Sequence, residues 1–386
     1  MKVTFPDIGC AGIIAGTFFR DLGIDYIPAL PPDNAEEGEI CPDAPEDMCL
    51  PFKLFLTGLD DAWRRGADTA VMISSGGPCR LGEFCELLKA ILDRRGCRYR
   101  WIILDMPSEV GIKELLRRIS VLFPELKKGR GALHLIRKLH DAHHLLKEAE
   151  AFEADLRRNA GYYEDPKAVN RLISACFEEL SQTGCLNRAF DIMGRYRWKS
   201  MQLNRDFSRS PVKIALTGEI FTLNDMRANR RIGDRLTELG VCFEKDITLS
   251  WWIRHTAAVS LKKILPLPPR RRKAAGSAAS RSGKESLRGR IGERIAGKRY
   301  LSCEIGGYTK ESVAFAASGK IRGMDGIIQI FPAGCMPEIV GHAILNRVSE
   351  KEGIPVMTLI YDELSGEAGY LTRMEAFTDM LARKRG

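Results

Sequence analysis

The chain has 386 residues, of which 45% are hydrophobic and 28% are charged, a balance typical of a globular protein long enough for two domains. It contains no run of about 18 uncharged apolar residues, and its start, MKVTFPDIG, lacks the apolar region of a secretory signal, so we expect a cytoplasmic protein without a membrane span. Eleven cysteines in such a chain argue against a disulfide framework and favour metal or redox roles.

The formal net charge of +9 comes from one segment. Residues 262–300 hold thirteen Lys/Arg and two Asp/Glu, a local balance of +11, which leaves about −2 for the rest of the chain. The segment is rich in Pro, Gly, Ala and Ser, so we interpret it as a basic flexible insert. Docking of an acidic partner or of a phosphate-bearing cofactor is the alternative. Nucleic-acid binding is disfavoured because no aromatic residue is interleaved with the cations.

The first hundred residues alternate between strands and helices. The pattern predicts strands at 2–6, 25–30, 69–74 and 99–104, helices over 11–22, 50–65 and 80–95, and a loop at 31–48. Alternation of this kind predicts a parallel sheet with right-handed crossovers, in a Rossmann-like or flavodoxin-like lobe over residues 1–106.

A helical region and a second α/β unit follow. Residues 107–210 show nearly continuous helical periodicity, which predicts a helical subdomain inserted between the lobes. The second lobe, 211–386, includes the basic insert; its predicted elements are strands at 212–221, 326–332 and 355–363 and helices over 228–240, 339–353 and 370–384.

Three cysteines stand in short Gly/Pro turns at the heads of predicted helices. Cys79 follows the strand TAVMIS in SGGPC, and Cys335 follows the strand GIIQIFP in AGCMPE. Cys49 opens the helix CLPFKLFL after a loop rich in Pro and acidic residues. Because such turns gather beyond the carboxyl ends of parallel strands, and because helix N-termini stabilise thiolates, we expect these three cysteines to bind one iron-sulfur cluster.

A fourth ligand is left open between two cysteines. Cys10 also lies between a predicted strand and a helix, and Cys41 lies eight residues before Cys49. The alternative for Cys10 is a small buried residue at a tight turn. The remaining cysteines fall in apolar or loop contexts and are interpreted as core or surface thiols: Cys85, Cys97, Cys176, Cys185, Cys242 and Cys303.

Several segments together resemble one known superfamily. The segments are MKVTFP, CLPFKLFLTGLDDAWRRGADTAVM, GGPCRLG, KIALTGEIFTLND, DGIIQIFPAGCMPE and LIYDELSGEAGYLTRMEAFTDML. They are similar to the 2-hydroxyacyl-CoA dehydratase and benzoyl-CoA reductase superfamily, and most of all to its activase-associated branch, which includes proteins like component D of 2-hydroxyglutaryl-CoA dehydratase. The likeness covers both α/β lobes in order, whereas the helical middle and residues 262–300 carry little of it.

The resemblance implies a function. It implies an oxygen-sensitive cluster between two lobes, held at Cys49, Cys79 and Cys335, and low-potential electrons delivered by a separate ATP-hydrolysing activase in an anaerobe. A 4Fe-4S cluster is expected, and a double-cubane cluster is the alternative; many relatives carry a further Cys or Gly where this chain has Ser74 and Ser75. It further implies reductive or radical chemistry on an acyl-CoA or another small molecule by a lyase or oxidoreductase component, which we expect to be a dimer.

Carboxylates at strand ends are the weaker catalytic candidates. Glu363 and Glu367 follow the strand PVMTLIY, as does Asp362, and Glu219 follows the strand KIALTG. Each is a possible acid or base, and the alternative for the first group is an acidic cap on the closing helix.

Other motifs argue against further sites. The histidines in HDAHH share one helical face, and we interpret that face as solvated; they are His140, His143 and His144. No phosphate-binding loop is present, so ATP would have to be hydrolysed by a partner. A non-catalytic electron carrier remains the competing function, and a nucleic-acid-binding protein that uses the basic insert is the third.

Overall fold

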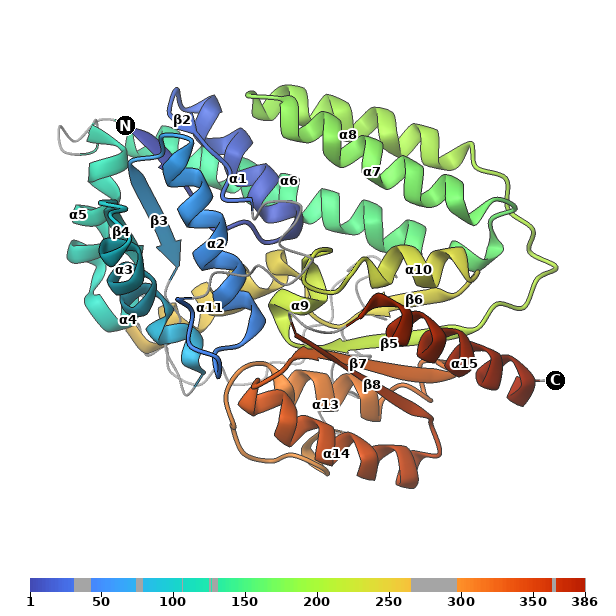
Figure 1. Cartoon of the computed structure of the whole chain (residues 1–386). Coiled ribbons are helices and arrows are strands. Elements are labelled where there is room, and N and C mark those ends of the chain that lie inside the picture. The colour runs from blue at the N-terminus through green and yellow to red at the C-terminus, as the bar shows by residue number, and fades with distance from the viewer. Residues whose placement is uncertain are drawn as a thin grey trace, which may run out of the picture.

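The computed structural model describes residues 1–30, 43–73, 79–105, 107–124, 126, 131–264, 297–362 and 366–385. Two four-stranded parallel sheets, each flanked by helices, confirm the predicted two-lobed α/β class (Figure 1). Five predictions lie outside the described residues in whole or in part: residues 31–42 of the predicted loop, Cys41, the serines Ser74 and Ser75, Glu363, and most of the basic insert, residues 265–296.

The N-terminal sheet has the order β2-β1-β3-β4. Its strands are β1 (Lys2–Thr4), β2 (Asp25–Tyr26), β3 (Thr69–Ile73) and β4 (Arg100–Leu104), and its helices are α1 (Gly9–Asp21), α2 (Leu50–Arg64) and α3 (Phe84–Arg94). Alternate residues of β3 serve opposite faces, because successive strand side chains point to opposite sides. Ala70 and Met72 are buried with residues of α2 and α3, and Val71 is buried with residues of α1.

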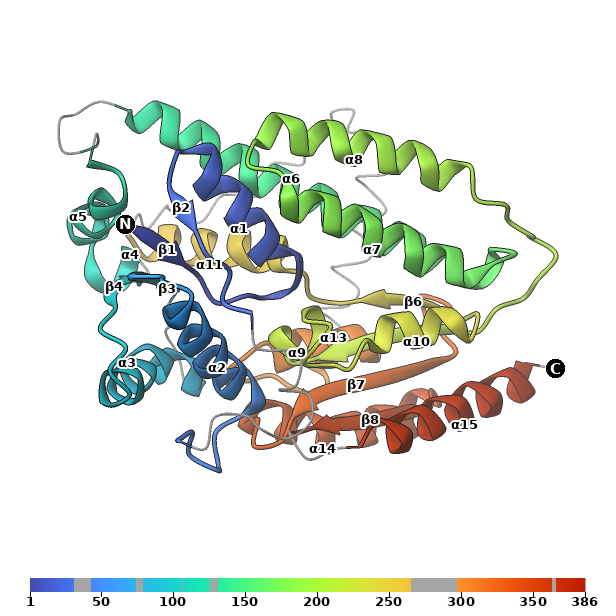
Figure 2. The ribbon, with the colours of Figure 1, turned by 45° about the horizontal axis from the view of Figure 1, so that its top comes forward.

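A layer of helices lies over the N-terminal lobe. It comprises α6 (Ala132–Arg158), α7 (Pro166–Gln182) and α8 (Leu186–Met201). The two helices before it, α4 (Pro107–Val110) and α5 (Ile112–Leu122), lie beside β4 instead (Figure 1). The described residues of 107–207 form no strand beyond an isolated bridge between Tyr163 and Arg205, as predicted. Both views show α6, α7 and α8 running side by side above α1 and above α10 (Ile232–Glu238) of the second lobe (Figure 2). The helical layer therefore spans the two lobes.

The C-terminal sheet repeats the strand arrangement of the first. Its strands are β5 (Lys213–Gly218), β6 (Cys242–Lys245), β7 (Gly326–Pro332) and β8 (Val356–Tyr361), in the order β6-β5-β7-β8. The helices around it are α9 (Ile220–Asn224), α13 (Thr309–Ala317), α14 (Met336–Glu352) and α15 (Glu367–Arg385). Helix α11 (Leu249–Ile264) follows β6 in the chain but packs against α4 and α6. Both sheets thus match the first four strands of the flavodoxin-like order.

Local signals explain where several helices begin and end. Asp165 accepts a hydrogen bond from the backbone N–H of Lys167 at the start of α7, and Pro166 occupies the first helical position, where its missing N–H costs nothing. At the other end of α14, Gly353 adopts a φ of +63°, the left-handed conformation that ends many helices. The sequence analysis did not predict β6, α11 or α13.

The two lobes share one continuous apolar core. Residues of α2 and α3 are buried in the same cluster as residues of β5, β7 and α15, and the rings of Phe55 and Phe221 meet edge to face with centroids 5.1 Å apart. A contact of this kind is worth about 1 kcal/mol beyond the area it buries. In the described part of the chain, no helix is both long enough and apolar enough to cross a membrane.

Candidate functional site

A large cavity opens where the two sheets face each other. In each sheet the chain order reverses between the two central strands, β1 and β3 in the first and β5 and β7 in the second. Ligands of open parallel sheets bind beyond the carboxyl ends of the strands at such a reversal. The residues that follow all four strands line the cavity, among them Phe5, Glu219 and Cys335, and its volume is about 1400 Å³.

One close approach at this edge depends on a glycine. Gly218 ends β5 with a φ of +140°, and a Cβ there would lie 1.8 Å from the carbonyl oxygen of Ile330 on β7. The next residue, Glu219, donates its backbone N–H to the same oxygen at 3.0 Å. No other residue type fits this geometry, so Gly218 lets the chain turn from β5 directly into the cavity.

The three predicted cysteines all line this cavity. Each is the residue immediately before a helix: Cys49 precedes α2, Cys79 precedes a short 3₁₀ turn (Arg80–Glu83) that leads into α3, and Cys335 precedes α14. Two of these helices belong to the N-terminal lobe and the third to the C-terminal lobe. The thiols are half-buried and form no disulfide.

Arg80 connects the three cysteine-bearing turns. Its Nη1 donates to the carbonyl oxygen of Asp47 at 2.9 Å, two residues before Cys49, and its Nη2 donates to the carbonyl oxygen of Gly334 at 2.5 Å, one residue before Cys335. Because Arg80 itself follows Cys79, one guanidinium group holds the backbone beside all three cysteines.

Burial raises the pKa of all three thiols, that of Cys49 to about 12. The carboxylate of Glu219 raises the pKa at each cysteine further, whereas the charge of Arg80 lowers it at Cys49 and Cys79. Without a bound cation the thiols are therefore protonated at neutral pH. A metal that binds here would have to displace these protons, as thiolate sites generally require.

Cysteine thiolates can hold either a single metal ion or an iron-sulfur cluster. Among the described residues, no group of three or more His, Cys, Asp or Glu side chains lies close enough together to hold one metal ion. In an iron-sulfur cluster each thiolate binds a different iron, so its ligands surround a larger group. Here three thiols from separate segments line one cavity.

Three of the seven carboxyl groups that line the same cavity lie just beyond strands of the C-terminal sheet. Glu219 accepts hydrogen bonds from the backbone N–H groups of Phe221 and Thr222 at 2.9 and 2.8 Å, so it caps α9, and burial raises its pKa. Glu338 is 2% exposed and is hydrogen-bonded by Thr309 and Gln329; burial raises its pKa to about 7.

The third carboxyl group, Asp246, follows β6. Its Oδ2 accepts a hydrogen bond from Thr217 Oγ1 at 2.5 Å, and its Oδ1 is buried without a hydrogen-bond partner among the described residues. Burial raises its pKa to about 7, and nearby Glu338 adds to the rise. Two carboxyl groups that titrate near neutrality thus face the cavity.

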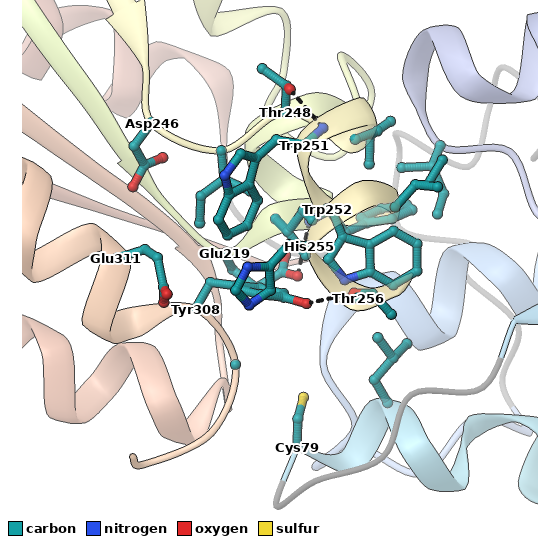
Figure 3. Close-up of a pocket in the computed structure, with 18 of the residues that line it drawn as sticks. Cys79, Glu219, Asp246, Thr248, Trp251, Trp252, His255, Thr256, Tyr308 and Glu311 are labelled. Carbon is teal, nitrogen blue, oxygen red and sulfur yellow. Dashed lines mark hydrogen bonds between the residues drawn. The ribbon is translucent and has the colours of Figure 1, made fainter. Parts of the chain in front are cut away.

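Helix α11 forms an aromatic wall of the cavity. Trp251 and His255 stack with ring centroids 4.7 Å apart, and the ring of Tyr308 meets Trp251 edge to face. Figure 3 shows Cys79 across from this group, with its sulfur directed toward Tyr308 and His255. The sequence analysis missed this wall, although the apolar side chains in SWWIRHTAAV recur at helical spacing and would have predicted the helix.

The other predicted site residues lie elsewhere. Cys10 is the second residue of α1, but it does not line the cavity; burial raises its pKa, and the charged groups closest to it belong to α6 and β6. Its neighbours Ile8 and Ala11 do line the cavity, while its helix packs under α6–α8, so a fourth ligand at Cys10 stays a prediction. Glu367 begins α15 and pairs with Arg235 at 2.8 Å, as the alternative of an acidic first turn predicted.

The histidines divide between two environments. His140 and His144 are exposed on α6, with 76% and 50% of their side chains accessible, in keeping with a solvated face. His143 instead lines the cavity, and burial lowers its pKa. Of the remaining cysteines, Cys185 and Cys303 are exposed, and four are buried in the core: Cys85, Cys97, Cys176 and Cys242.

Comparison with known proteins adds no relative. No family model matches the chain, and no curated protein matches it.

Proposed function

We propose that the chain is an iron-sulfur protein in which Cys49, Cys79 and Cys335 hold a cluster, 4Fe-4S in the simplest case, in the cavity between the two lobes. The proposal also includes an electron-donating partner, a separate ATP-dependent activase, and reductive or radical chemistry on a small molecule or an acyl-CoA. One observation carries it: thiols from three helix starts in two lobes line one cavity, and Arg80 hydrogen-bonds the backbone next to two of them.

The cavity is larger than a cluster alone requires. Small-molecule sites commonly have volumes of about 300–1,000 Å³, and this cavity measures about 1400 Å³. Its room for a second molecule favours an enzyme over a non-catalytic electron carrier, in which cysteines saturate every iron. When bound through three thiolates, a cluster would supply one-electron chemistry and one iron open to a substrate oxygen.

The side chains of the cavity support such chemistry in two ways. The aromatic wall formed by Trp251, His255 and Tyr308 presents ring faces and edges to the side of the cavity where Cys79 lies (Figure 3). Glu338 and Asp246, with pKa values of about 7, can hold a proton or release it near neutral pH. A substrate in this cavity would thus meet proton donors and the thiol-lined face together.

Iron content tests the proposal. Anaerobically purified wild type should contain iron and sulfide and give an EPR signal after reduction. The variants Cys49→Ser, Cys79→Ser and Cys335→Ser should each lose most of the iron, the sulfide and the signal. Cys185→Ser is the matched control, because Cys185 is exposed at the start of α8 and does not line the cavity. Unchanged iron in all three cavity variants would contradict the proposal.

A second measurement separates the enzyme from the carrier. In the enzyme, adding acyl-CoA thioesters to the reduced protein should change the EPR spectrum, because a substrate would sit beside the open iron. In the carrier, the spectrum should be indifferent to every thioester, and a fourth thiolate ligand should be detectable.

A further inference from the structure

Arg80 is the side chain at which the three cysteine-bearing turns meet. Its two hydrogen bonds go to the backbone carbonyl groups of Asp47 and Gly334. These two residues lie 287 positions apart in the sequence. The bond to Gly334 crosses from one lobe to the other, since Arg80 precedes α3 and Gly334 follows β7. The side chain is 31% exposed, so solvent screens it only in part.

The chemistry of the two bonds requires arginine. A guanidinium group presents several N–H donors in a rigid planar fork, so one side chain can reach two carbonyl oxygens in fixed directions. A lysine at position 80 would keep the positive charge, but its single ammonium group on a flexible stem would not hold both carbonyl groups in this geometry. Charge and geometry can therefore be separated by substitution.

The partner position is equally specific. Gly334 adopts a φ of +77°, and a Cβ there would lie 3.2 Å from Arg80 Nη2 and 3.2 Å from the carbonyl oxygen of Asp47. Gly334→Ala would strain the backbone and press on both neighbours without changing any charge. It is the uncharged counterpart of a substitution at Arg80.

We infer that Arg80 is a positioning residue that fastens the turns of Cys49 and Cys335 to the turn of Cys79, and that its charge makes the reduced iron-sulfur cluster easier to form. The inference rests on the proposed function, because it assigns a role toward the cluster proposed for these cysteines. The hydrogen bonds assemble the ligand set, and the charge offsets the negative charge of thiolates and of an added electron.

Three variants separate the two roles. Arg80→Met removes both the hydrogen bonds and the positive charge. Iron retention against a chelator should therefore fall about 10- to 100-fold, the usual effect of losing a hydrogen bond behind a metal ligand. The reduction potential should become more negative. Arg80→Lys and Gly334→Ala should lose iron similarly but keep the potential near that of wild type. Arg117→Met, on exposed α5, is the matched control and should change neither property.

A merely structural role of Arg80 would lower iron retention in all three variants without moving the potential in Arg80→Met, and that outcome would overturn the charge half of the inference. Iron retention equal to wild type in Arg80→Met would overturn the positioning half. If Cys49→Ser, Cys79→Ser and Cys335→Ser also keep their iron, the proposed function itself fails, so the two failures are distinguishable.

Cross-linking tests the positioning role without iron. In the metal-free folded protein, a short bis-maleimide should join Cys79 to Cys335 and Cys79 to Cys49, as read by peptide mass spectrometry. Both cross-links should become several-fold less abundant in Arg80→Met and in Gly334→Ala but not in Arg117→Met. Equal yields in all four proteins would contradict the inference, and circular dichroism would show that each variant is folded.

Discussion

Glu338 is a buried acid that pairs with no cation among the described residues. Its carboxyl group is 2% exposed, and the groups that bond to it are the hydroxyl of Thr309 and the amide of Gln329. Neutral donors stabilise a carboxylate less than a cation does, so burial dominates and the pKa rises from 4.5 to about 7. The folded protein therefore holds this proton more tightly than the unfolded chain does.

Glu338→Gln should flatten the pH dependence of stability. Since the folded-state pKa is the higher one, the stabilisation is fully present below about pH 4.5 and is lost as the pH rises through about 7. The loss should amount to about 3 kcal/mol at most, at 1.36 kcal/mol for each pKa unit. Urea denaturation of wild type and variant between pH 4.5 and 8 measures the difference.

In that experiment the free energy of unfolding of Glu338→Gln should increase relative to that of wild type as the pH rises. Glu350→Gln is a suitable control, because Glu350 is an exposed residue of the same helix, α14. A difference between Glu338→Gln and wild type that is independent of pH would show that Glu338 is ionised in the folded state throughout this range.

Turn chemistry predicted the cavity cysteines and Glu219, but it did not predict Glu338 or Asp246. Cys79 and Cys335 follow apolar strands directly, so their place at the sheet edge is a local property of the sequence. Glu338 looks like an ordinary first-turn acid of α14, and its burial depends on Gln329 of β7 and Thr309 of α13. Cys10 shows the limit of the same rule, since it follows β1 at this edge but does not itself line the cavity.

Helix α11 begins at a contact with a distant helix. Its first backbone N–H groups, at Leu249 and Ser250, donate to Glu150 of α6 at 2.7 and 3.1 Å, and the hydroxyl of Ser250 bonds to the same carboxylate. Negative charge at a helix N-terminus satisfies free N–H groups and interacts favourably with the helix dipole. The aromatic wall of the cavity is thereby fastened to the helical layer.

Glu150→Ala should loosen α11 selectively. Loss of the cap should cost about 1 kcal/mol of stability and raise amide hydrogen exchange over residues 251–256, which include Trp251 and His255. Glu148→Ala, two residues earlier on α6, is the control, since Glu148 faces His144 instead. Exchange that rises equally in both variants, or in neither, would contradict the capping role.

The sequence predicted those strands and helices that are marked by residues within the element itself or next to it. The run TAVMI became β3, and the helix predicted over 50–65 became α2 with Pro51 in its first turn, where proline is tolerated. The cap of α11 comes from a residue about a hundred positions earlier, which no local pattern reveals. Strand β6 has four residues, too few for alternation to be recognised.

The whole molecule is joined across the lobes by one ion-pair group. Arg227 of the second lobe binds Asp7 of the first at 2.6 Å and Asp225 of its own lobe at 2.8 Å. The backbone N–H of Gly9 also reaches Asp225, at 3.2 Å. Burial raises the pKa of Asp7 to about 6, and Arg227 opposes the rise. Together with the shared apolar core, this group predicts that the lobes unfold as one unit.

Arg227→Leu should weaken both lobes, and more strongly at pH 8 than at pH 5. At pH 8 it leaves two ionised, part-buried carboxylates without their cation, and removing one partner of a fully buried pair costs about 3–5 kcal/mol. We expect about 2 kcal/mol, because the Arg227 side chain is 28% exposed and water screens the pair in part. At pH 5, below the pKa of about 6, Asp7 is already mostly protonated and the cost should be smaller.

Urea denaturation at the two pH values measures this difference, and hydrogen exchange locates it in the structure. Slowly exchanging amides of β3 and β7, one strand from each lobe, should lose the same protection in Arg227→Leu, because each opens only when the whole chain unfolds. Arg117→Leu should leave both strands unchanged, since Arg117 pairs with Glu114 on the exposed side of α5. Protection lost in one sheet and kept in the other would mean that the lobes open separately, despite the apolar core that runs between them.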